Sequence, residues 1–154
     1  MTKLPSPETL AAVVSNVTES LCGFAFVPGE PFAASEPVRG RMFIVPFDGD
    51  RQISVLLSCD RAGSQALVAA LSQVNPDTVS DEMAGNAIRE LLNLIAGRLH
   101  RTLEFAAPTA LRQATLVTIP DLERPDNAEA ILLRSTGAID ARLWIIERAP
   151  EAGA

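Results

Sequence analysis

A long amphipathic helix constrains the fold of this chain more than any other feature. Ser80 is a preferred helix-capping residue, and apolar residues then recur at helical spacing to about Glu104. With successive residues about 100° apart around the axis, the apolar side chains fill one half-turn arc. We therefore expect the helix to lie against the core of the domain through that arc. Its members are Ala84, Ala87, Ile88, Leu91, Leu92, Leu94, Ile95 and Leu99.

The opposite side of the same helix carries a narrow polar stripe of four residues: Asn86, Glu90, Asn93 and Gly97. A glycine inside a helix costs about 1 kcal/mol relative to alanine, so Gly97 needs a compensating reason. Without a side chain there, another backbone can approach closely beside Asn93. We interpret the polar stripe as a surface for a partner. The alternative is the ordinary solvated side of an amphipathic helix.

Size and charge limit the classes of function. The chain has 154 residues, 47% of them hydrophobic, which fits a single domain over residues 1–148 and a flexible tail over 149–154. A formal net charge of −6 offers no basic field for nucleic acid or an anionic membrane, so we expect neither as a partner. No apolar run approaches the roughly 18 residues that cross a bilayer. We expect a soluble, cytoplasmic protein that meets a protein partner or a small ligand.

The usual catalytic and metal-binding groups are scarce. The two cysteines, Cys22 and Cys59, belong to no CxxC pair, and we expect two buried free thiols. His100 is the single histidine, which excludes a metal site built from histidines. Its place on the polar side of the helix predicts a solvated side chain. No glycine-rich phosphate loop is present, and we expect no metal and no cofactor in this chain.

The first half of the chain predicts a helix, a β-hairpin and a second helix. The first helix begins after Ser6 and stops at Gly23. Two strand-like runs, over residues 38–47 and 51–59, flank a short Asp-Gly-Asp turn and predict the hairpin. Asp60 is placed to cap the second helix.

The second half predicts three strands after the long helix, over residues 113–119, 128–134 and 138–147. The last strand is apolar on both faces at residues 144–146, which belong either to the core or to an interface. Together the elements predict an α/β domain of the α+β type. Its sheet is mostly antiparallel, with the first helix and the long helix packed on one face.

The long helix resembles the characteristic helix of the CheC/FliY/CheX phosphatases of bacterial chemotaxis. The family motif is a Glu and an Asn three residues apart, followed shortly by Ala-Gly, and the match here is Glu90, Asn93, Ala96 and Gly97. This chain is most similar to CheX in its single copy of the motif, its length and its order of elements, whereas CheC and FliY carry two such helices. The resemblance covers nearly the whole domain and implies a CheX-like fold.

The resemblance also implies an activity, the hydrolysis of the aspartyl phosphate on a CheY-like response-regulator receiver domain. Carried over, Glu90 anchors the active-site lysine of the receiver and Asn93 positions the attacking water. Asn86 and Gly97 are then partner-binding residues beside them. The receiver supplies Mg²⁺, so this chain needs no metal of its own. A homodimer is implied as well, and proline-bounded strand edges could pair across its subunits.

The sequence departs from the family pattern at two places. Asn86 stands where the pattern often has Asp or Ser, and the proline expected after the motif is not matched at its usual spacing. A non-catalytic binding module of the same fold, as in the flagellar switch proteins, is the first alternative. An unrelated α/β domain with an accidental match in the helix is the second. The intact Glu90 and Asn93 favour the phosphatase.

Overall fold

The computed structural model of the chain describes residues 4–29, 41–103, 105, 110–117, 128–137 and 139–148. The end of the strand predicted over residues 113–119 and the tail predicted over residues 149–154 lie outside these residues. The elements in chain order are α1 (Pro7–Cys22), β1 (Phe26–Gly29), β2 (Arg41–Asp48), β3 (Gln52–Cys59), α2 (Arg61–Ser72), the 3-10 turn η1 (Pro76–Thr78), α3 (Asp81–Thr102), β4 (Ala110–Leu111), β5 (Thr115–Leu116), β6 (Ala128–Ser135) and β7 (Ala141–Arg148).

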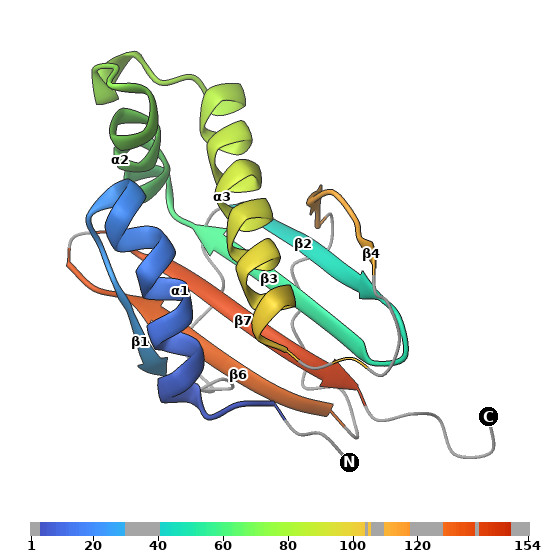
Figure 1. Cartoon of the computed structure of the whole chain (residues 1–154). Helices are drawn as coiled ribbons and strands as arrows, with labels where there is room; N and C mark the ends of the chain where they lie inside the picture. The colour runs from blue at the N-terminus through green and yellow to red at the C-terminus, as the bar shows by residue number, and fades with distance from the viewer. Residues whose placement is uncertain are drawn as a thin grey trace.

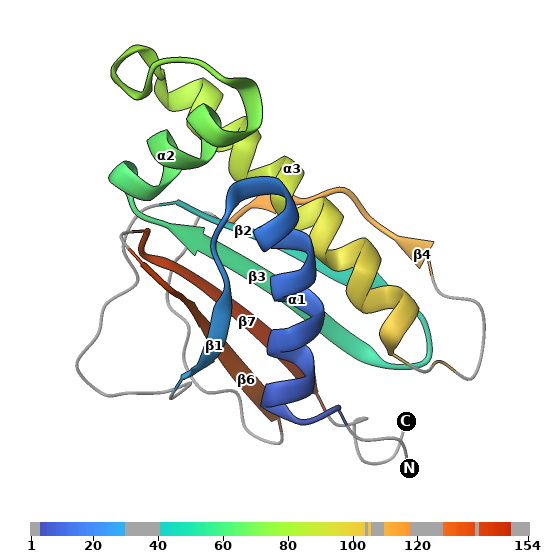
Figure 2. The ribbon, with the colours of Figure 1, turned by 60° about the vertical axis from the view of Figure 1, so that its left-hand side comes forward.

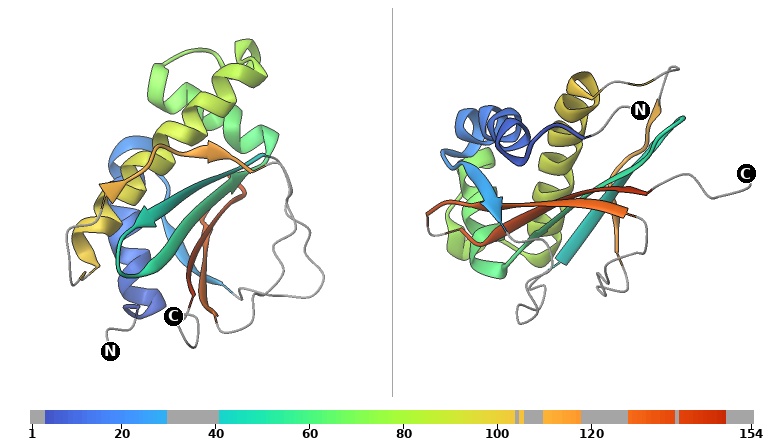
Figure 3. Two further views of the ribbon diagram at one scale, coloured as in Figure 1. Left: turned by 90° about the vertical axis from the view of Figure 1, so that its right-hand side faces the viewer. Right: turned by 90° about the horizontal axis from the view of Figure 1, so that it is seen from below.

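Among the described residues, seven strands form one antiparallel sheet. The strand order is β1-β6-β7-β3-β2-β4, and β5 also pairs with β2. α1 and α3 lie side by side on one face, and α2 stands at one end of the sheet and packs against α3 (Figure 1 and Figure 2). Figure 3 shows from two further directions that the helices share one side of the sheet. The predicted antiparallel α+β domain with both long helices on one face is confirmed.

The helix ends follow from their capping residues. The hydroxyl of Ser6 accepts the N–H of Thr9 at 3.2 Å, and Gly23 ends α1 in the left-handed region with φ 77°. In α3 the hydroxyl of Ser80 accepts the N–H of Met83 at 3.1 Å. These are the starts and the stop that the sequence predicts. The hairpin of β2 and β3 and the helix α2 also form where they were expected.

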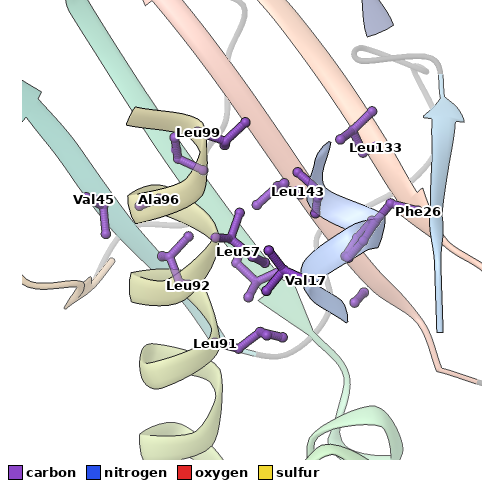
Figure 4. Close-up of a cluster of buried hydrophobic side chains, with 14 of the residues drawn as sticks. Val17, Phe26, Val45, Leu57, Leu91, Leu92, Ala96, Leu99, Leu133 and Leu143 are labelled. Atoms are coloured by element: carbon purple, nitrogen blue, oxygen red, sulfur yellow. The ribbon is translucent and has the colours of Figure 1, made fainter. Parts of the chain in front are cut away.

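The main core lies between the helices and the sheet. In Figure 4, side chains of α3 meet Leu57 of β3 and Leu143 of β7, while Val17 of α1 and Phe26 of β1 extend the same cluster. Burying each large aliphatic side chain contributes about 1.5–3 kcal/mol, so this contact fixes the rotation of α3 about its axis. The α3 side chains that are at most 1% exposed are Ile88, Leu91, Leu92, Ile95, Ala96 and Leu99.

The buried arc of α3 lies further round the helix than the sequence predicts. Leu94 was expected in the core, but it is 46% exposed, whereas Ala96 is buried. The reason is the position of α3 over β2: a Cβ on Gly85 would lie 2.8 Å from the Arg41 guanidinium and 3.8 Å from the Phe43 ring. The side of α3 that carries Leu94 therefore turns away from the sheet.

Two further expectations were wrong. His100 is half-buried. Its ring stacks on that of Phe105 with 5.3 Å between centroids, and it makes a T-shaped contact with the Phe47 ring with 5.9 Å between centroids. These aromatic neighbours are remote in sequence or lie past the helix end, so helical periodicity could not reveal them. The strand predicted over residues 113–119 is reduced to the two residues of β5 in its described part, because residues 113 and 114 leave the ladder.

A second apolar cluster lies on the face of the sheet that points away from the helices. Alternation along β7 places Ile145 in the main core and its neighbours on the other face, all of them buried. The apolar residues predicted at 144–146 are thus core residues on both faces. The members of this second cluster are Met42, Leu56, Leu132, Trp144 and Ile146.

Alanine substitutions at Leu92 and Leu94 test the orientation of α3. Leu92 is 0% exposed, so Leu92→Ala leaves a cavity and lowers the free energy of unfolding by about 2–5 kcal/mol. Leu94→Ala shortens an exposed side chain and lowers the free energy of unfolding by less than about 1 kcal/mol. Chemical denaturation of both variants gives the two values. Equal losses would show that α3 is rotated from the orientation described.

Candidate functional site

The polar stripe of α3 faces outward, opposite the core. Asn86 and Glu90 are exposed, and Asn93 and Gly97 are half-buried. Within the described part of the chain, neither Asn86 nor Glu90 has a hydrogen-bond or ion-pair partner. Because α3 is packed over its whole length, the Glu90 carboxylate stands on a rigid element and is available to a cation from outside.

Asn93 is not free, in contrast to Glu90. Its Oδ1 accepts the backbone N–H of Ala114 at 2.9 Å, and its Nδ2 donates to Oε1 of Gln113 at 3.4 Å. The amide is therefore held between α3 and the segment that joins β4 to β5. Gln113 and Ala114 could not be identified from the sequence, because no periodic pattern links them to Asn93, which lies 20 positions before Gln113.

Gly97 lies beside an open groove between α1 and α3. A Cβ built on Gly97 would meet no atom within 4 Å, so the space next to Asn93 is empty, as its place in the polar stripe suggested. The groove has a volume of about 360 Å³. Two exposed apolar side chains lie on it, Leu21 at 41% and Leu94 at 46% exposure. Its lining residues are Asn16, Val17, Ser20, Leu21, Asn93, Leu94, Gly97, Arg98 and Arg101.

Three arginines of α3 lie near the polar stripe, and among the described residues none of them pairs with Glu90. The guanidinium carbon of Arg89 lies 5.4 Å from the centre of the Phe43 ring, a cation–π contact that holds this side chain on the β2 side of α3. Arg98 and Arg101 lie along the groove on the α1 side. The stripe thus presents one negative group, Glu90, between positive groups on both sides. A partner that docks here meets both signs of charge within a few helical turns.

The thiols take no part in this site. Both cysteines are free, as predicted, but only Cys59 is buried as expected, whereas Cys22 is half-buried. Burial raises the pKa of Cys22 to about 11 and that of Cys59 to about 12, the latter despite a hydrogen bond with Ser64 that opposes the shift. Both thiols are therefore protonated near neutral pH, and neither is an activated nucleophile.

The described residues contain no group of three or more His, Cys, Asp and Glu side chains that could hold a metal ion. None of the helices described has an apolar stretch long enough to cross a membrane. What the site offers is an unpaired carboxylate, an oriented amide and an open stretch of helix backbone. These groups can bind and orient a partner or a ligand.

Comparison with solved structures supports the fold over nearly the whole chain. Chemotaxis protein CheX from Vibrio vulnificus is 16% identical with a TM-score of 0.69, covering 90% of this chain and 93% of that one. CheX in the CheX-CheY-BeF3-Mg²⁺ complex from Borrelia burgdorferi is 17% identical with a TM-score of 0.71, covering 91% and 96%. The FliM-SpeE complex from H. pylori also matches, with 10% identity, a TM-score of 0.61 and coverage of 92% and 83%.

Sequence comparison identifies the family. No curated protein matches the chain. The family model described as chemotaxis phosphatase CheX matches residues 42–132, which is more than half of the chain and includes the whole polar stripe. The family resemblance noted in the helix is thus confirmed by an independent match that extends from β2 into β6. The chain belongs to the CheX family of chemotaxis phosphatases.

Proposed function

We propose that this chain is a phosphatase for the aspartyl phosphate of a CheY-like receiver domain. The observation that carries the proposal is the placement of Glu90, Asn93 and Gly97 on one outward face of α3, beside an open groove. A CheX–CheY complex among the similar structures supports a CheY-like partner. The proposal places the chain in the cytoplasm as a homodimer that meets the receiver through α3.

The proposed reaction requires few reactive groups from this chain. A water oxygen attacks phosphorus, the bond between phosphorus and the aspartyl oxygen breaks, and the products are a free carboxylate and inorganic phosphate. An acyl phosphate is already reactive, and the Mg²⁺ belongs to the receiver, so the main requirement is to orient the water. Asn93 does this through its amide, which can both donate and accept hydrogen bonds.

Glu90 has a separate task in the proposal. Its carboxylate pairs with a lysine of the receiver and fixes the register of docking. A charge-assisted hydrogen bond that forms in a desolvated interface is stronger than one between neutral groups. The lack of any partner for Glu90 within the described part of the free chain leaves the carboxylate ready for this contact.

A binding module without activity is the second candidate. The specific observation in its favour is that both polar atoms of the Asn93 amide already have partners in Gln113 and Ala114. However, Oδ1 keeps a second lone pair and Nδ2 a second hydrogen, so one water can still be held. Wild-type protein that binds the phosphorylated receiver without speeding loss of phosphate would decide for the binding module.

Substitution of Asn93 tests the role of the amide. Asn93→Ala and Asn93→Asp both lower the rate of phosphate release from a phosphorylated receiver by about 10²-fold, because neither keeps the amide hydrogens. Asn93→Asp keeps an oxygen that accepts the N–H of Ala114, so this variant should retain the wild-type structure. Asn93→Ala loses that hydrogen bond and should be less stable. Phosphate release and thermal unfolding are measured together. Either folded variant with the wild-type rate would contradict the mechanism.

Glu90→Ala tests the anchoring contact. The loss of one partner of a charge pair raises the KM for the phosphorylated receiver at least about tenfold, while the rate at saturating receiver stays near that of the wild type. Glu82→Ala is the matched control, because Glu82 is an exposed acid of the same helix more than two turns away. Steady-state kinetics over a range of receiver concentrations separate the two effects. An equal rise of KM in Glu90→Ala and Glu82→Ala would show that the rise comes from the change in net charge alone.

Gly97→Ala separates stability from docking. The added methyl group meets no atom within 4 Å, and alanine is favoured over glycine in a helix by about 1 kcal/mol, so the variant unfolds at a higher temperature. If the receiver backbone approaches here, the same variant binds the receiver more weakly. Thermal unfolding and titration with receiver measure the two quantities. A more stable variant with unchanged binding would show that the partner does not contact Gly97.

A further inference from the structure

The segment that holds Asn93 is a β-bulge on the edge of the sheet. Phe47 pairs with Leu111 on one side of the segment, and Ile44 pairs with Thr115 on the other. Two residues of β2, at positions 45 and 46, therefore oppose three residues, at 112–114. One extra residue in one strand defines a bulge, which bends the strand and turns its side chains and amides in new directions.

The sequence of β2 accounts for the place of the bulge. Pro46 lies opposite the extra residue, and proline has no N–H to donate to a neighbouring strand. The edge ladder is therefore interrupted there. It resumes where Ile44 pairs with Thr115, and the N–H of Val117 then donates to the carbonyl of Met42 at 2.8 Å. The interruption frees the N–H of Ala114 from the ladder and gives it to Asn93 instead.

The bulge selects one orientation of the Asn93 amide. A side-chain amide can turn over and exchange its oxygen and nitrogen, but a backbone N–H can be accepted only by the oxygen. Ala114 is 4% exposed and packs in the main core, so its N–H has a fixed position. Gln113 stabilises the orientation that the Ala114 N–H selects, because its Oε1 accepts from Nδ2 at 3.4 Å. Both contacts are made in the same orientation of the Asn93 amide.

We infer that Gln113 is a positioning residue for the proposed phosphatase reaction. Together with the N–H of Ala114, it holds the Asn93 amide so that one hydrogen on Nδ2 and one lone pair on Oδ1 remain for the attacking water. An amide held in advance loses less freedom when the water is ordered, which favours the reaction. This inference rests on the proposed function, and it assigns to the bulge a task beyond covering the edge of β2.

Gln113→Ala tests the inference, with Thr115→Ala as the matched control. Thr115 is an exposed residue of the same segment, and the described hydrogen bonds of the Asn93 side chain go to Gln113 and Ala114, so Thr115→Ala should keep the wild-type rate. Gln113→Ala lowers kcat about fivefold at an unchanged KM, the effect expected from the loss of one neutral hydrogen bond. Gln113→Glu keeps an oxygen that accepts from Nδ2 and restores the orientation of the amide.

A double-mutant cycle separates positioning from other effects of Gln113. Because Gln113 acts through Asn93, Gln113→Ala should have no further effect in the Asn93→Ala background. A fivefold loss in both backgrounds would overturn the inference and leave the phosphatase proposal intact. A wild type that binds receiver without speeding loss of phosphate would instead overturn the phosphatase proposal itself.

A spectroscopic readout tests the same contact without activity. The side-chain NH₂ resonances of Asn93 should shift in Gln113→Ala and return toward the wild-type position in Gln113→Glu, because the acceptor of Nδ2 is lost and then replaced. Thr115→Ala should leave them in place. Unchanged Asn93 resonances in Gln113→Ala would overturn the positioning role.

Discussion

The burial of one side of α3 against the sheet is the constraint on which the rest of this structure depends. Six side chains of the helix are nearly inaccessible to solvent, and together they leave α3 a single rotation about its axis. The same contact that stabilises the core therefore aims the polar stripe. A functional group on a packed helix is held more precisely than one on a loop, and this explains how so few polar residues can define a site.

The site is assembled where that helix meets the edge of the sheet. α3 contributes Glu90 and Asn93, while the bulged segment beside β2 contributes the contacts that orient Asn93. Substitutions near these two parts have different effects on the site. A change in the core moves the whole stripe, whereas a change in the bulge alters a single amide. The direction of the polar stripe and the orientation of the Asn93 amide are thus set by different parts of the structure.

Much of this fold could be predicted from the sequence because its signals are local. Helical periodicity, capping at Ser80 and the short turn between β2 and β3 each depend on residues close together in the chain. Glu90 and Gly97 were found in the same way. The outward turn of Leu94 could not be predicted, since it depends on how closely α3 approaches β2. The burial of His100 depends on Phe47, which is remote in sequence.

Gln113 shows most clearly where sequence reasoning stops. Nothing around it indicates a functional residue, and the run over residues 113–119 looks like an ordinary strand. Its role arises only from the register of β4 and β5 on β2, which the pattern of one strand does not determine. The residue that orients a motif can therefore lie in a segment that carries no motif.

The way in which the sheet ends also bears on how this protein can associate. An outer strand with unpaired backbone groups recruits other chains and promotes aggregation. Here β4 and β5 cover both halves of the β2 edge, and at the opposite end β1 has four residues, one of them Pro28. β1 pairs only with residues 132–135 of β6, so the outer edge of β6 over residues 128–131 has no partner strand among the described residues. The backbone left open at this end is only four residues long, and so short an edge limits growth of the sheet by repeated strand addition.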